Sequence, residues 1–409
     1  MLRRQLLLLL IALPSLGLLA FLVAVPRLGQ ELTISLLAEA SSAADPVEQA
    51  SVRRELQLSI EEFRRLNPGV KVQLRVVPAK ALVNELTYRS ARGLGPDLLN
   101  LAGNASVVKD LYQRGFISAV DLSEQERLNI RPEFLALQQL NGKQIAVPLY
   151  VLPSLACYNS RKMPVPPAQL PDLIRLSQEN HPIGLGSALS DLDWLFSGFG
   201  MPSNFSSQNP PNRFAVLQTL RWLRQANLQL HIVFVQTVDE LRQGLAVGTF
   251  EWIPCYTTWV PMLKEKLGKD LGLALLPAGP VGPSMPRLRF RVWAFGSQSS
   301  NRQRVVAQRL VAYSTNVVAQ RMVSLQLGTV LPVNPNIALP LRIYPTLAIS
   351  EKAIKKSQYL TLSQRHRLLH SSILAQPLID QLLAGVQSPE ATTNKLIEVL
   401  VAPSGGGKR

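Results

Sequence analysis

Residues 60–77 read Ile60-Glu-Glu-Phe-Arg-Arg-Leu-Asn-Pro-Gly-Val-Lys-Val-Gln-Leu-Arg-Val-Val77. In and before this stretch, apolar residues recur at the spacing of one helix face, at Val52, Leu56, Ile60 and Phe63. The triplet Asn67-Pro-Gly69 stops that helix, and from Val70 onward apolar residues alternate with polar ones as in a strand. The stretch therefore predicts a helix over 51–66 followed directly by a strand over 70–77.

The same alternation of strands and helices continues on both sides. A short apolar run at 32–37 predicts a strand before the helix, and 97–101 predicts one after it, with helices at 80–92 and 105–114. Further strands are expected at 144–150, 155–159, 250–256, 271–276 and 288–295, and further helices at 172–178, 213–227, 236–246 and 302–325. The chain from 345 to 401 is largely helical by the same criteria, and 403–409 is a flexible polar tail. This pattern predicts an α/β protein whose sheets are mostly parallel.

Composition narrows the class of protein. The 409 residues are 47% hydrophobic and only 17% charged, which excludes a disordered chain or a coiled coil. A formal net charge of +16 suits an anionic surface such as a membrane, an envelope polymer or a nucleic acid. The basic residues are scattered and no basic-aromatic reading motif is present, so we expect no nucleic-acid partner.

The first segment has the layout of an export signal. Arg3 and Arg4 precede an apolar run over residues 6–25, which is long enough to span a bilayer. No cysteine comes directly after the run, so acylation as a lipoprotein is excluded. We expect residues 1–29 to be a signal peptide or signal anchor, with the body periplasmic or otherwise extracytoplasmic. Residues 6–25 would hold the body in the inner membrane if they are not cleaved.

Signals of catalysis, metal binding or cofactor binding are missing. His366 and His370 have the spacing of two metal ligands, but arginines flank them and no glutamate lies between them, so we expect a solvated basic helix face. Asp191 and Asp193 are the nearest approach to an acidic pair, and we assign them a loop role. The sequence thus predicts no catalytic residue, no metal and no cofactor.

Four segments, in order, resemble the bacterial family 1 extracellular solute-binding proteins, which are the maltose-binding-protein-like subunits of ABC sugar importers. They are residues 60–72, 95–122, 141–159 (Asn141-Gly-Lys-Gln-Ile-Ala-Val-Pro148 leading to Leu155-Ala-Cys-Tyr-Asn159) and 248–280. The third segment is the most telling, because it resembles the stretch where the family's chain first crosses between lobes. Weaker similarity extends the resemblance over roughly residues 31–400.

The resemblance implies a two-lobed periplasmic-binding-protein fold of type II, with a hinge between lobes that close on a ligand. Lobe one would comprise 31–147 plus 286–329, and lobe two 150–283 plus 334–402. The crossings would fall near 147–149, 284–286 and 330–334.

Ligand-binding residues follow from the resemblance and from the rarity of aromatics, which are 6% of the chain. The candidates are the aromatics Trp259, Tyr150, Trp194 and Trp293 and the polar residues Glu39, Asn104 and Asn334. For each, packing in the core is the alternative. Asp97 is expected to cap or orient its loop, although the family often places a carboxylate there. We expect Trp222 in the core.

One departure from the family concerns the return strand. Where many relatives carry a glycine pair, this chain has Arg287, Arg289 and Arg291 at alternate positions. These arginines could bind an anionic substrate in the cleft, and Arg291 is a further ligand candidate. The alternative, which we favour, is a solvated strand edge. Cys157 and Cys255 would lie on strands of lobe two, either joined by a disulfide or as two buried thiols.

Together these features predict an extracytoplasmic solute-binding subunit of an ABC importer. Its partners would be a small polar ligand, such as a sugar or a sugar-like osmolyte, and a permease in the inner membrane. The alternative is a membrane-tethered envelope scaffold or interaction protein that has lost ligand binding.

Overall fold

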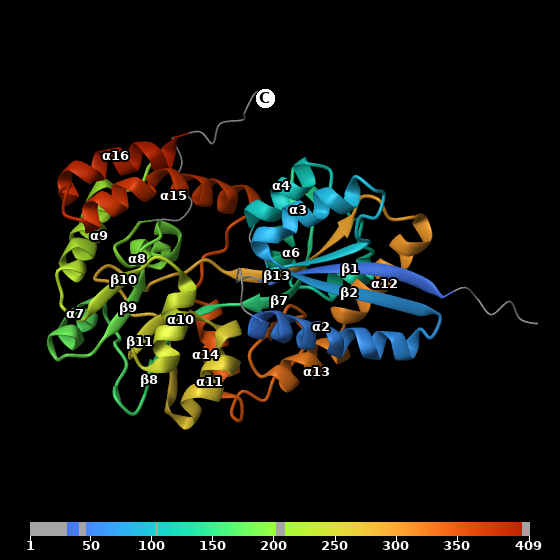
Figure 1. Ribbon diagram of the computed structural model, residues 1–409, viewed down its shortest axis with the longest axis horizontal. Coiled ribbons are helices and arrows are strands. Elements are labelled where there is room, and N and C mark those ends of the chain that lie inside the picture. Colours follow the sequence, from blue (N-terminus) through green and yellow to red (C-terminus); the bar gives the residue numbers. More distant parts are fainter. Residues whose placement is uncertain (1–30, 41–45, 103–104, 202–208, 403–409) are drawn as a thin grey trace, which may run out of the picture.

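The computed structural model of the chain describes residues 31–40, 46–102, 105–201 and 209–402. Its longer strands form two separate sheets, and helices cover both of them (Figure 1). The first sheet lies to the right in Figure 1 and the second to the left, so the α/β chain has two lobes as expected.

The first sheet has the order β14-β7-β13-β3-β1-β2, with β4 paired to β13. Its strands are β1 (Leu32–Ala40), β2 (Val70–Pro78), β3 (Leu98–Leu101), β4 (Ile117–Ser118), β7 (Val147–Leu152), β13 (Arg289–Gly296) and β14 (Leu331–Pro332). Strand β1 is parallel to β2 and β3, whereas β13 is antiparallel to β3 and β7.

The second sheet has the order β10-β9-β11-β8-β12. Its strands are β8 (Ser154–Asn159), β9 (Ile183–Gly186), β10 (Ile232–Val235), β11 (Trp252–Tyr256) and β12 (Leu271–Ala274). Strands β9 and β10 were not expected from the sequence. A separate small hairpin pairs β5 (Gln139–Leu140) with β6 (Lys143–Gln144).

Both sheets are mixed, which corrects the expectation that they are mostly parallel. Parallel pairs form where a helix connects the strands, as α2 does between β1 and β2. Strand β13 instead enters the first sheet from the second lobe and runs antiparallel to both long neighbours. In the second sheet the antiparallel pairs are those of β8, which follows the first crossing and pairs with β11 and β12.

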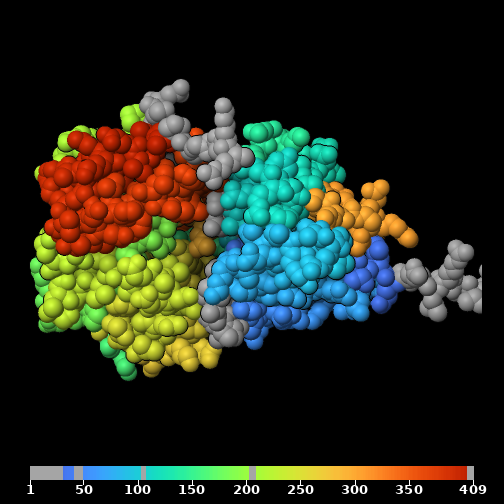
Figure 2. All heavy atoms as spheres, turned by 45° about the horizontal axis from the view of Figure 1, so that its top comes forward, coloured from blue at the N-terminus to red at the C-terminus, as the bar shows by residue number. Residues whose placement is uncertain are grey.

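Helices pack on the sheets of both lobes. In the first lobe they are α2 (Pro46–Leu66), α3 (Ala79–Ser90), α4 (Ala105–Gln113), α5 (Glu124–Leu128), α6 (Pro132–Ala136), α12 (Asn301–Ser314) and α13 (Val317–Leu327). Around the second sheet they are α7 (Leu170–Gln178), α8 (Asp193–Gly198), α9 (Arg213–Asn227), α10 (Val238–Val247), α11 (Val260–Leu267), α14 (Pro345–Ile354), α15 (Leu362–Leu383) and α16 (Pro389–Val401). In Figure 2 the red C-terminal helices lie on the mass that contains the second sheet.

The single helix expected over 302–325 is two helices in the structure. Thr315 ends α12, and Asn316 begins α13 by accepting a hydrogen bond from the Ala319 N–H at 2.8 Å. Asparagine is a favourable N-cap because its side chain satisfies an N–H that the helix leaves free. The apolar periodicity does not reveal this break, since both helices present an apolar face to the same core.

The chain passes between the sheets over very short segments. Strand β7 ends at Leu152 and β8 begins at Ser154, so only Pro153 separates them. On the return, Pro286 and Arg287 lead from the second lobe into β13. No helix in the ranges that the structure covers is long and apolar enough to cross a membrane. The apolar run over residues 6–25 and the tail 403–409 lie outside those ranges.

A disulfide joins two neighbouring strands of the second sheet. Cys157 of β8 and Cys255 of β11 are bonded, with their Cα atoms 5.7 Å apart. In the antiparallel register Cys157 faces Ile253 and Cys255 faces Leu155, so the bond runs diagonally across the strand pair. Both cysteines are buried. Of the two alternatives that the sequence left open, the disulfide is the one observed.

Loss of this disulfide should destabilise the protein. The cysteines are 98 residues apart, and cross-links that close long loops typically contribute about 2–5 kcal/mol. We expect reduced wild-type protein and the Cys157→Ala/Cys255→Ala variant to unfold at lower urea concentration than oxidised wild type. Mass spectrometry would show that both thiols of the reduced wild-type protein are free. If that reduced protein then had the same urea midpoint as the oxidised protein, the expectation would be contradicted.

Candidate functional site

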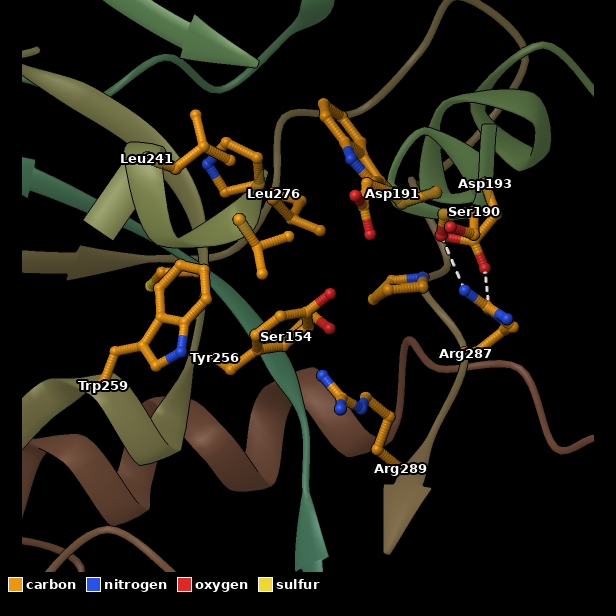
Figure 3. A pocket seen from close by; sticks show the side chains of 15 residues that line it. Ser154, Ser190, Asp191, Asp193, Leu241, Tyr256, Trp259, Leu276, Arg287 and Arg289 are labelled. Atoms are coloured by element: carbon orange, nitrogen blue, oxygen red, sulfur yellow. Dashed lines mark hydrogen bonds and ion pairs between the residues drawn. The ribbon is translucent and has the colours of Figure 1, made fainter. Parts of the chain in front are cut away.

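A pocket opens where β8 begins and β11 ends, beside the segments that connect the lobes. Its space amounts to about 460 Å³, including part that is open to solvent. Side chains line it from four places: the 3-10 turn η1 (Leu189–Asp191) with α8, the start of α10, the end of β11 with the turn η2 (Thr257–Trp259), and the start of β13 (Figure 3). Ser154 and Pro286, which flank the crossings, also line it.

Aromatic side chains form one wall of the pocket. Tyr256 and Trp259 meet edge to face, with ring centroids 4.9 Å apart and an interplanar angle of 77°. The chain turns there because β11 ends at Tyr256, and Pro261 then occupies the first turn of α11. Trp194 contributes a third aromatic side chain from α8. Such a wall suits the apolar faces of a small polar ligand.

Charged side chains lie among these aromatic residues. Arg287 is ion-paired with Asp193, and its Nη2 donates a hydrogen bond to the Ser190 carbonyl oxygen at 2.6 Å (Figure 3). The Arg289 guanidinium lies over the Tyr256 ring, 4.1 Å from its centroid. The pocket thus combines aromatic faces with both signs of charge.

Burial shifts the pKa values of the pocket carboxyl groups. It raises the pKa of Asp191 to about 6, and the neighbouring Asp193 adds to this effect, whereas Arg287 and Arg289 oppose it. Burial also raises the pKa of Asp193, against the attraction of Arg287. The pKa of the Tyr256 hydroxyl is raised by burial as well. Asp191 therefore changes charge in a mildly acidic pH range.

Two of the sequence candidates, Trp259 and Trp194, line this pocket. The acidic pair that we assigned to a loop lies there too: Asp191 closes η1 and Asp193 begins α8. Tyr256 was not among the candidates. Its position directly before the turn that carries Trp259 is the signal that could have revealed it. Asn104 lies outside the described residues.

Arg291 and Tyr150 lie in the core of the first lobe. The Arg291 Nη1 donates to Asn100 Oδ1 at 2.7 Å and to the Glu39 carbonyl oxygen at 3.2 Å, and its Nε lies 3.4 Å from Glu55 Oε1. Arg291 is 2% exposed and Tyr150 1%. Burial raises the pKa of Glu55, and Arg291 opposes that shift. Burial, with a contribution from Glu55, raises the pKa of Tyr150 far above its usual range.

The remaining candidates make contacts within the first lobe. Trp293 is buried, and its Nε1 donates to Ser314 Oγ at 2.9 Å. The Glu39 carboxylate accepts a hydrogen bond from the Ala102 N–H at 2.9 Å.

Two of these candidates hold loops in place. Asp97 accepts the Ser35 N–H at 2.7 Å, which agrees with its expected role in orienting a loop. Asn334 donates to the Thr315 carbonyl oxygen at 2.9 Å. The structure therefore brings neither residue to the pocket.

The three arginines do not form the solvated strand edge that we favoured. Strand β13 pairs with β7 along Arg289–Trp293 but with β3 only from Val292 onward, so Arg289 and Arg291 have a neighbouring strand on one side. Burial of their side chains, complete for Arg291 and partial for Arg289, is what excludes a solvated edge. Arg287 and Arg289 line the pocket, whereas Arg291, two residues further along β13, is buried in the first lobe. The shift in strand register follows between Arg291 and Val292, so all three arginines precede it.

Of the histidine pair, His370 is exposed as expected, whereas His366 is not. His366 faces α4, where its Nε2 lies 3.3 Å from Asp110 Oδ1 and its Nδ1 lies 3.5 Å from Lys109 Nζ. Burial and Lys109 lower the pKa of His366, while Asp110 opposes them. Within the described ranges, no group of three or more His, Cys, Asp or Glu side chains could hold a metal ion.

Comparison with known proteins gives a match in structure only. No family model matches the sequence, and neither does any curated protein. The GacH receptor of Streptomyces glaucescens, solved unliganded and with acarbose, superposes with a TM-score of 0.73 at 15% identity, over 90% of this chain and 98% of that one. A cyclo/maltodextrin-binding protein in complex with maltotetraose gives a TM-score of 0.69 at 14% identity, over 90% of this chain and 96% of that one.

The chain therefore has the two-lobed fold of maltose-binding-protein-like solute-binding proteins. The two comparison structures are a receptor and a binding protein.

Replacing Arg291 tests its structural role. Arg291→Met leaves the Glu55 carboxylate buried without its cation, which typically costs about 3–5 kcal/mol. Without Arg291 the pKa of Glu55 in the folded protein rises further. The protonated carboxyl is neutral and can stay buried at little cost. As the pH rises through the folded-state pKa, the carboxyl ionises without a partner and the folded protein is destabilised. The free energy of unfolding measured with urea should be lower for Arg291→Met than for wild type, and the difference should grow with pH.

A second substitution supplies the control. Glu55→Gln in the Arg291→Met background should remove most of the pH dependence, because no ionisable group then remains at that position. The assignment of Arg291 as the cation that neutralises Glu55 would be contradicted by a loss of unfolding free energy that is equal at all pH values. A pH-dependent loss that Glu55→Gln does not alter would contradict it as well.

Proposed function

We propose that the chain is the extracytoplasmic solute-binding subunit of an ABC importer and that it binds a small polar, sugar-like ligand. The observation that carries this proposal is the pocket beside the lobe crossings, where Tyr256, Trp259 and Trp194 meet polar and charged side chains. An apolar wall with a few placed polar groups is typical of small-molecule sites. Acarbose and maltotetraose, bound by the two structurally similar proteins, support a sugar-like ligand.

The proposed mechanism is closure of the two lobes around the ligand. The proposed lobes are 31–147 plus 286–329 and 150–283 plus 334–402, with crossings near 284–286 and 330–334. The first crossing lies at Pro153 rather than near 147–149, because β7 stays in the first sheet as far as Leu152. Short connections such as Pro153 support hinge bending, because a few residues can absorb the change in backbone angles. Aromatic contacts and hydrogen bonds in the pocket would share the binding energy. The closed form would deliver the ligand to a permease in the inner membrane.

Two observations support an extracytoplasmic location. The disulfide between Cys157 and Cys255 is of the kind that persists in oxidising compartments. The basic and then apolar N-terminus, residues 1–29, has the order of an export signal or signal anchor. We propose that the body is periplasmic, cleaved from this segment or anchored by residues 6–25.

The alternative function is a tethered envelope scaffold without a ligand. The net charge of +16 and the missing acylation cysteine favour it. A ligand screen decides between the two functions. A ligand at 100 times its dissociation constant stabilises the folded protein by about 2.7 kcal/mol, which a thermal-shift measurement detects. The panel holds disaccharides, glycosylglycerols, polyols, sugar phosphates and glycerol phosphates.

With a ligand from that screen, Trp259 can be tested against a matched tryptophan. Trp259 and Trp222 are 8% and 7% exposed, but only Trp259 lines the pocket. We expect Trp259→Leu to weaken binding about three- to tenfold, as loss of an aromatic contact of about 0.5–1.5 kcal/mol implies. Titration calorimetry measures the change.

The control is Trp222→Leu, which removes a similarly buried indole from α9 and should leave the affinity unchanged. Equal affinity for wild type and Trp259→Leu would remove Trp259 from the site. Equal losses in both variants would indicate a general loss of packing.

A further inference from the structure

The two arginines of the pocket have different surroundings. Arg287 is ion-paired with Asp193 and donates a hydrogen bond to the Ser190 carbonyl oxygen. Its charge is therefore balanced inside the protein, and the same contact occupies the Asp193 carboxylate. Neither group of this pair is available as the main charge for a ligand.

Arg289 is held without such a partner. Its guanidinium lies 4.1 Å from the centroid of the Tyr256 ring, and among the described residues no carboxylate or hydrogen-bond acceptor engages it. Stacking uses the face of the planar group and leaves its N–H donors free at the edge. Arg289 thus presents an oriented cation to the pocket.

Trp194 supplies a second free donor from another element. Its side chain is 3% exposed and lines the pocket, and its Nε1–H has no hydrogen-bond partner in the described part of the chain. A buried N–H without a partner is unfavourable until water or a ligand accepts its hydrogen bond. The pocket therefore offers N–H donors from β13 and from α8.

Asp191 is the charged group that remains. Figure 3 shows Asp191 and Arg289 entering the pocket from opposite sides. The titratable and charged groups near Asp191 are Asp193, Arg287, Arg289 and the Tyr256 hydroxyl. Burial, opposed by the arginines and reinforced by Asp193, raises the pKa of Asp191 to about 6. The four charged side chains are balanced when Asp191 is ionised, and they carry one net positive charge when it is protonated.

We propose that this pocket binds the acidic group of an anionic small molecule, a carboxylate, sulfate or phosphate, with Arg289 as the charged contact and Trp194 as a second donor. The proposal rests on the solute-binding role proposed above and specifies the class of ligand. Arg289 matches the geometry of such groups because a guanidinium can donate two parallel hydrogen bonds to them. Asp191 modulates the affinity through its own charge.

Inorganic sulfate is the first probe, because it carries the acidic group without a sugar. Binding to the full chain is followed by tryptophan fluorescence at fixed ionic strength, since Trp194 and Trp259 line the pocket. We expect saturable binding by wild type and at least a tenfold weaker response for Arg289→Gln. Arg302→Gln, which removes an exposed arginine from α12, is the matched control and should bind as wild type does. Equal responses of wild type and Arg289→Gln would overturn the proposal.

Three related sugars identify the source of the acidic group. D-glucuronate carries a carboxylate and glucose 6-phosphate carries a phosphate, while glucose is their neutral counterpart. We expect one acidic sugar to bind at least tenfold more tightly than glucose, and Arg289→Gln to abolish that preference. A preference that persists in Arg289→Gln would overturn the role of this residue.

The pH dependence provides an independent readout. Sulfate keeps its charge between about pH 5 and about pH 7.5, whereas Asp191 becomes protonated over that interval. Protonation removes a negative charge facing the anion, so wild type should bind sulfate more tightly at the lower pH. Asp191→Asn should bind tightly at both pH values. A pH dependence that survives in Asp191→Asn would contradict the modulation by Asp191.

The outcomes separate this inference from the proposed function. Binding of neutral sugars without any Arg289-dependent response to sulfate would preserve the solute-binding role and overturn the acidic ligand class. Arg289-dependent sulfate binding, with no affinity for any sugar or polyol, would preserve the anion site and overturn the sugar-like ligand.

Discussion

Three guanidinium groups leave bulk water along the five residues that lead from the second lobe into the first, and the structure depends on how each is accommodated. A buried cation is tolerated only with compensating charge or hydrogen bonds. Arg287 is paired with Asp193, Arg289 lies over Tyr256, and Arg291 is held by Asn100, Glu39 and Glu55. The first two sets of partners belong to the second lobe and the third to the first lobe. This stretch therefore fixes the start of β13 against both sheets.

The sequence allowed the order of most long elements to be predicted, because their apolar periodicity is independent of tertiary contacts. The helix over 51–66 and the strand over 70–77 correspond closely to α2 and β2. Strands β9 and β10 were missed, although β3 and β12, which also have four residues each, were predicted, so shortness alone does not explain the omission. The break between α12 and α13 was missed because it depends on one side-chain hydrogen bond of Asn316.

Candidate site residues were harder to predict than elements. Trp259 and Trp194 line the pocket, whereas Tyr150 and Trp293 are packed in the first lobe. Strands in a sheet covered on both faces are buried on both sides, so alternation does not indicate which aromatic faces a cavity. The arginines illustrate the same limit, because their surroundings depend on contacts with Asp193, Tyr256 and Glu55. All three partners are distant from them in the sequence.

The disulfide has a topological consequence for the second lobe. Residues 157–255 form a covalent ring, which contains η1 and the start of α8 and therefore contributes Asp191, Asp193 and Trp194 to the pocket. The closing bond lies within the pocket wall, because Cys255 is itself a lining residue. A single peptide-bond cleavage anywhere inside the ring would open it into two segments that stay joined at β8 and β11. Both strands would thus remain covalently linked beside the pocket after such a cut.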